Sequence, residues 1–248
     1  MRTSFGSQQN SRQEGLFDTD SRLETAGLRD ERVTSFLRTV YGWMFLGLGI
    51  TAVTAFVIAG SPVIMETILS NRSALWIVLL GQLGLVLFLS IRVNSLAPIT
   101  AAALFIVYSA LTGVTASLIL LVFTGASIVT TFIITAGMFG SMAVFGTVTK
   151  RSLAGVGQFF FMGLIGLILA SIVGFFFQSP ALQFVISVVG VLIFTGLTAW
   201  DAQRLKQMAV SLPADRVGSY AILGALTLYL DFINLFFFLL RFTGSRRD

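Results

Sequence analysis

Residues 219–244, SYAILGALTLYLDFINLFFFLLRFTG, decide the fold of this chain. The stretch is long enough to cross a bilayer, because about 20 apolar residues span the hydrocarbon core. Asp231 lies near its middle, where insertion scales put the cost of a carboxylate at about 3 kcal/mol. Interactions with the rest of the fold must therefore offset that cost.

On a helix, the small and polar residues of this stretch fall on one narrow stripe, while Leu, Ile and Phe cover the rest of the surface. The stripe consists of Gly224, Thr227, Asp231 and Asn234. The spacing predicts that the stripe faces partner helices and that the remaining surface of the helix is apolar. The polar side chains have two interpretations. They either form hydrogen bonds that hold neighbouring helices together or belong to a functional site, which is the default interpretation of an ionisable group inside a membrane.

Composition indicates an all-α, polytopic transmembrane bundle. The 248 residues are 56% hydrophobic and 11% charged, whereas soluble domains carry about 25% charged residues. The net charge of +5 comes from basic residues beside the apolar runs, where they set orientation and do not indicate nucleic acid. The chain has no cysteine and no histidine. Disulfides, Cys/His zinc sites and Ser-His or Cys-His catalysis are thereby excluded, and any metal site must use oxygen ligands, which favours Ca²⁺.

The chain divides into a polar, mostly disordered tail over residues 1–33, a transmembrane domain over 34–244 and a short basic tail over 245–248. The transmembrane domain contains seven apolar runs, of which the third and fourth are separated only by Thr124 and Gly125. The runs cover residues 35–59, 74–91, 98–123, 127–148, 153–177, 181–204 and 219–242. A link over residues 205–218 joins the last two.

The distribution of Lys and Arg predicts a cytosolic N-terminus. With that orientation, twelve basic residues fall on the inner side and four on the outer side, as the positive-inside rule requires. Three of the outer four follow the last run and argue the other way. The side of the C-terminus therefore depends on whether that run crosses completely.

Two acids lie within the predicted spans, Asp231 and Asp201, and Thr198 lies one turn before Asp201. Consecutive antiparallel spans are usually neighbours, so the two carboxylates can face each other. In a low-dielectric site two adjacent carboxylates cannot both ionise cheaply, and we expect them to share a proton. Such a pair responds to pH and can hold a hard cation once it is deprotonated. Arg92, at the inner end of the second run, is the nearest candidate counter-charge or, equally, an interfacial arginine that snorkels.

Three segments resemble the Bax inhibitor-1 family in its bacterial branch: FGTVTKRSLAGVG at 145–157, FTGLTAWDAQRLK at 194–206 and GALTLYLDFINLFFFLLRFTG at 224–244. The resemblance implies seven helices with the last one central, wrapped by the other six. It also implies a pH-sensitive Ca²⁺ leak, without bound cofactor, gated by two aspartates that map onto Asp201 and Asp231. The family's latch, a basic residue at the end of the second helix, corresponds to Arg92 by position.

Two other functions compete with the leak. Some bacterial members of the family are tied to a membrane protease, which would make the chain a non-catalytic regulator of another membrane protein. An intramembrane aspartyl protease also needs two aspartates on adjacent helices. Those proteases carry Gly-x-Gly-Asp, whereas residues 228–231 read Leu-Tyr-Leu-Asp, so the sequence argues against an enzyme.

Overall fold

In a computed structural model, residues 4–177 and 179–247 are described, with side chains for 27–71, 73–177 and 179–247. This part of the chain forms eight helices, seven of them long and apolar enough to span a membrane. The seven predicted spans are confirmed, including the break after the third. The helices are α1 (Ser4–Ala59), α2 (Pro62–Ser70), α3 (Arg72–Arg92), α4 (Pro98–Val122), α5 (Gly125–Val148), α6 (Ala154–Phe177), α7 (Pro180–Ser211) and α8 (Val217–Thr243).

Short turns separate these helices, and the sequence supplies a capping residue or a proline at the starts of α2, α3, α4, α5 and α7. The side chains of Asn71, Thr124 and Ser179 accept hydrogen bonds from the first turns of α3, α5 and α7. Pro98 begins α4 and Pro180 begins α7. Both prolines are accommodated because the first helical position needs no backbone N–H. The break at residues 123–124 thus follows from an N-cap, although the hydropathy signal is nearly continuous.

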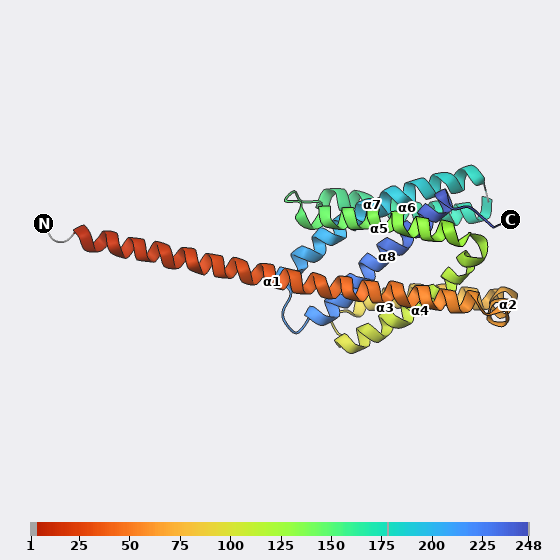
Figure 1. Ribbon diagram of the computed structural model, residues 1–248, viewed down its shortest axis with the longest axis horizontal. Coiled ribbons are helices and arrows are strands. Elements are labelled where there is room, and N and C mark those ends of the chain that lie inside the picture. Colours follow the sequence, from red (N-terminus) through yellow and green to blue (C-terminus); the bar gives the residue numbers. More distant parts are fainter. Residues whose placement is uncertain (1–3, 178, 248) are drawn as a thin grey trace.

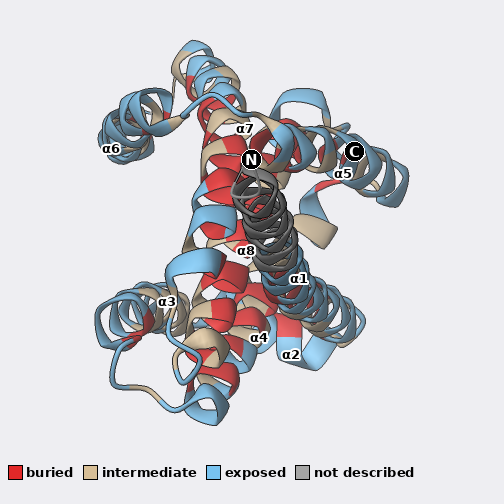
Figure 2. Ribbon diagram, turned by 90° about the vertical axis from the view of Figure 1, so that its left-hand side faces the viewer, coloured by how far each residue is buried: buried red, intermediate tan, exposed pale blue. Residues whose placement is uncertain are grey.

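Helix α8 is the centre of the bundle (Figures 1 and 2). Its apolar window is 67% buried, against 6% for α3 and 11% for α6. Helices α1, α4, α5 and α7 pack directly on α8, while α3 packs on α4 and α6 packs on α7. The central position of the last helix is therefore confirmed, but it is wrapped chiefly by four helices and not equally by all six.

The apolar surface of α8 packs mostly against other helices. Leu226, Leu228 and Leu235 are almost completely buried although they lie away from the polar stripe. A helix that is apolar all round belongs in the interior of a protein or in a membrane, and the central position of α8 agrees with that rule.

A polar network on another face of α8 ties it to α1 and α4. The hydroxyl oxygens of Tyr229 and Thr51 lie 2.6 Å apart, and Thr51 donates to the carbonyl oxygen of Ser109 at 2.9 Å. The rings of Phe105 and Tyr108 meet the Tyr229 ring edge-on, with centroids 5.7 and 5.9 Å away. Because each buried hydroxyl has a partner, the network holds α8 in register without an unsatisfied group.

The N-terminal segment over residues 1–33, predicted to be a mostly disordered tail, overlaps the start of α1. Residues 1–3 lie outside the described part of the chain, and α1 begins at Ser4. At the end of this segment, Arg32 donates to the carbonyl oxygen of Leu212 at 3.0 Å, which ties α1 to the end of α7. That long-range bond cannot be read from composition. Disorder of the segment in solution stays a prediction.

Two connections also differ from the sequence analysis. Helix α7 continues to Ser211, so the predicted link over 205–218 shrinks to residues 212–216. Leu205 and Ala209 are buried and give this extension a packed face. The segment between the first two apolar runs, which contains Glu66, forms the short helix α2.

The basic tail over residues 245–248 is attached to the turn between α4 and α5 in its described part. Thr124 donates its N–H to the carbonyl oxygen of Ser245 at 3.1 Å, and Arg247 donates to that of Val122 at 2.9 Å. The tail therefore lies at the α4–α5 end of the bundle, opposite the N-terminus (Figure 1). This placement agrees with a last helix that crosses completely.

Candidate functional site

A cavity of about 1150 Å³ lies beside α8, walled by α3 and α4 on one side and by α6 and α7 on the other. Its lining is mostly apolar. Polar side chains from α8, including Thr227, Asp231 and Asn234, line it together with Asp201 and Arg204 of α7. Three of the four residues in the stripe predicted on the last span therefore line a cavity, where contact with partner helices was expected.

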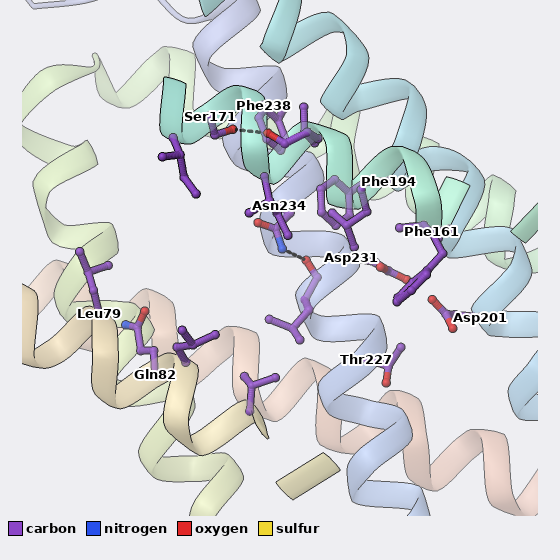
Figure 3. A pocket seen from close by; sticks show the side chains of 18 of the residues that line it. Leu79, Gln82, Phe161, Ser171, Phe194, Asp201, Thr227, Asp231, Asn234 and Phe238 are labelled. Atoms are coloured by element: carbon purple, nitrogen blue, oxygen red, sulfur yellow. Dashed lines mark hydrogen bonds between the residues drawn. The ribbon is translucent and has the colours of Figure 1, made fainter. Parts of the chain in front are cut away.

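Asp201 and Asp231 face each other across the contact between α7 and α8 (Figure 3). Only 6% and 4% of their surfaces are exposed. One oxygen of Asp231, Oδ2, is buried without any hydrogen-bond partner. Buried polar atoms are nearly always satisfied, so this orphan oxygen marks a place that a proton, water or cation can occupy.

The other stripe residues divide between the cavity and the packing. Thr227 and Asn234 line the cavity and donate to the carbonyl oxygens of Leu223 and Leu230 at 3.1 and 2.8 Å. These bonds lie within α8 (the one at Asn234 is dashed in Figure 3). The structure therefore places both side chains near the pair without hydrogen-bonding either to a carboxylate.

Gly224 and Thr198 lie away from the cavity. A Cβ at Gly224 would come within 2.6 Å of Leu205 Cδ2, so the glycine lets the extended end of α7 approach α8 closely. Thr198 is fully buried and donates to the carbonyl oxygen of Phe194 at 2.7 Å, inside α7. Both residues therefore belong to the helix packing around the pair.

The predicted latch is not at the pair in this structure. Arg92 is exposed at the end of α3 and does not line the cavity. The cationic side chain that lines the cavity together with Asp201 is Arg204, one turn further along α7. Its guanidinium lies over the ring of Trp200, 5.6 Å from the centroid. Because residues three apart share a helix face, the spacing from Asp201 was a usable signal that the sequence analysis did not weigh.

Further residues that the sequence analysis missed hold Asp201 in place. The Gln203 amide donates to the carbonyl oxygen of Arg151 at 2.8 Å and accepts from the N–H of Leu153 at 2.7 Å, which joins α7 to the connection between α5 and α6. Gly146 of α5 lies against the backbone of Ala199. Gln203 and Gly146 look ordinary in the sequence, and their contacts with other helices become visible only in the folded bundle.

The chemistry open to this site is that of two carboxyl groups. Within the described residues no group of three or more His, Cys, Asp or Glu could hold a metal ion together. A Ca²⁺ ion prefers six to eight oxygen ligands, so a passing ion at the pair would complete its shell with water or neutral oxygens. Two acids suit weak, transient binding better than permanent coordination.

Comparisons with known proteins agree over almost the whole chain. The family model "Inhibitor of apoptosis-promoting Bax1" matches residues 33–248. The inner membrane protein YbhL of Escherichia coli strain K12 is 48% identical over 216 residues, covering 86% of this chain and 92% of YbhL. An uncharacterized protein of Borreliella burgdorferi is 47% identical over 215 residues, covering 86% of this chain and 93% of its own. One from Deinococcus radiodurans is 41% identical over 217 residues, covering 87% and 93%.

Proposed function

This chain belongs to the Bax inhibitor-1 family, and from that premise we propose that it is a pH-sensitive Ca²⁺ leak gated by Asp201 and Asp231. The observation that carries the proposal is the buried carboxyl pair with an orphan oxygen, Asp231 Oδ2, beside a cavity. A purely structural pair would be expected to satisfy both oxygens. The proposed role is transport without catalysis and without a resident cofactor.

The gate works by exchange between a proton and a cation. At lower pH the two carboxyls share a proton, and that hydrogen bond holds α7 against α8. As the pH rises the proton leaves, and two bare carboxylates repel each other in a site of low dielectric. A Ca²⁺ ion then relieves the repulsion. Since metal binding requires deprotonated ligands, Ca²⁺ entry should increase with pH over the range in which the pair titrates.

The decisive experiment is Ca²⁺ uptake by liposomes that contain only this protein, measured at several pH values with an enclosed dye. We expect uptake above that of empty liposomes and a rise with pH. Uptake equal to that of empty liposomes at every pH would contradict the leak. In that case the alternative from the sequence analysis, a non-catalytic regulator that binds another membrane protein, would account for the same buried pair.

We further propose that the protein resides in the bacterial inner membrane, as the name of YbhL states for that relative, with a cytosolic N-terminus. Reporters fused after residue 20 and into the connection at 212–216 should then be cytosolic. Reporters in α2 near Glu66 and after Asp248 should lie on the other side. A cytosolic signal from the α2 fusion would reverse the assignment, and a cytosolic signal from the C-terminal fusion alone would contradict a complete crossing of α8.

Arg204, and not Arg92, should set the pH range of the gate. Arg204→Gln removes the cation beside Asp201 and makes ionisation of the pair more costly. The midpoint of the flux profile should therefore move upward by up to about one pH unit, the low end of the effect of an adjacent opposite charge. Arg92→Gln is the matched control and should leave the midpoint unchanged. The opposite result, a shift for Arg92→Gln alone, would restore the predicted latch at the end of α3.

A further inference from the structure

The cavity extends well beyond the acid pair, as an apolar groove between α3 and α6. Helix α3 packs on α4 and α6 packs on α7, and no comparable packing joins α3 to α6 within the described chain. The groove walls include Leu83 of α3 and Ile168 of α6, which are 57% and 52% exposed. Both helices have the length and composition of spans, so the groove opens sideways toward the bilayer.

The walls and the room in the groove suit acyl chains. The groove has a volume of about 1150 Å³. At about 30 Å³ for each heavy atom, the share of one water in the liquid, a 16-carbon acyl chain needs roughly 500 Å³. The groove therefore has room for at least one chain, and its apolar walls match that chain.

The charge at one end of the groove matches a phosphate. Arg204 lines that end, and its side chain is exposed. The same end carries the connection between α5 and α6, which holds Lys150 and Arg151 and is tied to α7 through Gln203. Arginine is well suited to phosphate because its planar guanidinium can donate two parallel hydrogen bonds. A phospholipid at this place would have its chains toward the Phe175 and Phe176 end of the groove.

We propose that the groove between α3 and α6 is a phospholipid site, in which acyl chains fill the apolar walls and the phosphate pairs with Arg204. The site does not depend on the proposed leak, because a lipid can bind whether or not ions pass. A bound chain would displace water from the apolar part of the cavity and leave the acid pair accessible mainly from the Arg204 end.

The proposal is tested by native mass spectrometry of the full chain in detergent, titrated with dioleoyl phosphatidylglycerol. The double variant Leu83→Trp and Ile168→Trp should narrow the groove and weaken binding about tenfold, the effect of losing about two buried methylenes. The matched control is Leu80→Trp and Ile165→Trp, on the same two helices at exposed positions outside the groove. It should bind like the parent chain. Circular dichroism and thermal unfolding establish that both variants fold.

The head group is tested separately with dioleoylglycerol, which has the same chains and no phosphate. Arg204→Gln should weaken phosphatidylglycerol and leave dioleoylglycerol unchanged. Equal lipid binding by the groove variant and the control variant would contradict a lipid site in the groove, since the bound lipid would then lie on the general membrane-facing surface. Equal binding of both lipids by the parent chain would overturn the role of the phosphate. If the parent chain forms a dimer that the groove variant does not form, the groove is an interface between two copies of the chain, and the lipid proposal is rejected.

Discussion

Replacing Asp231 with asparagine is expected to weaken Ca²⁺ affinity by about 10- to 100-fold, the range for losing a group that supports a bound metal. It should also flatten the pH dependence of flux. The side chain keeps its shape but loses the charge that draws the cation and the group that shares the proton with Asp201. The measurement is dye-reported Ca²⁺ uptake into proteoliposomes from pH 6 to pH 8. The fold should persist, because removing a buried charge removes a desolvation cost.

Asp215→Asn is the matched control, because Asp215 is an exposed loop acid beside Arg216 and makes no contact with the cavity. It should leave both affinity and pH profile unchanged. Asp201→Asn should act like Asp231→Asn, and the double variant should lose less than the sum of the two, since coupled groups are not additive. If Asp231→Asn keeps the parent flux and pH profile, the carboxylate is structural and the gate is wrong.

Much of the fold could be predicted because the requirements of membrane insertion are visible in short stretches of sequence. Seven apolar runs, short polar breaks and an acid in the last span follow from the absence of water in the bilayer core. The sequence also places one acid in each of two consecutive helices. Their encounter in the structure needs only that those helices be neighbours.

What could not be predicted depends on the shape of the whole bundle. The extension of α7 beyond Arg204 is polar enough to read as a link, and its helical state is supported by burial of Leu205 and Ala209. The cavity exists because α3 and α6 stand apart, which no local pattern encodes. For the same reason Arg92 looked like the nearest cation from its position in the chain, whereas the cation that lines the cavity with the pair is Arg204.

Gly146 illustrates how such contacts govern the site, and its replacement by alanine is expected to be strongly destabilising. A Cβ at this position of α5 would run into the backbone carbonyl of Ala199, which cannot rotate away as a side chain can. Overpacking usually costs about 1–3 kcal/mol, and a backbone neighbour puts this case at the upper end. Because Ala199 lies two residues before Asp201, we expect relief of the clash to shift α7 and to disturb the acid pair.

Gly140→Ala provides the matched control, since Gly140 lies on the same helix and a Cβ there would meet nothing within 4 Å. It should leave stability unchanged or raise it by about 0.5–1 kcal/mol, because alanine loses less backbone entropy than glycine in a helix. The measurement is the thermal unfolding midpoint in detergent, followed by Ca²⁺ uptake at two pH values. Equal midpoints for the two variants would mean that α5 and α7 are not in backbone contact. A lower midpoint for Gly146→Ala with unaltered pH dependence would mean that the acid pair tolerates a shift of α7, so that the position of Asp201 is held by Gln203 and not by the glycine contact.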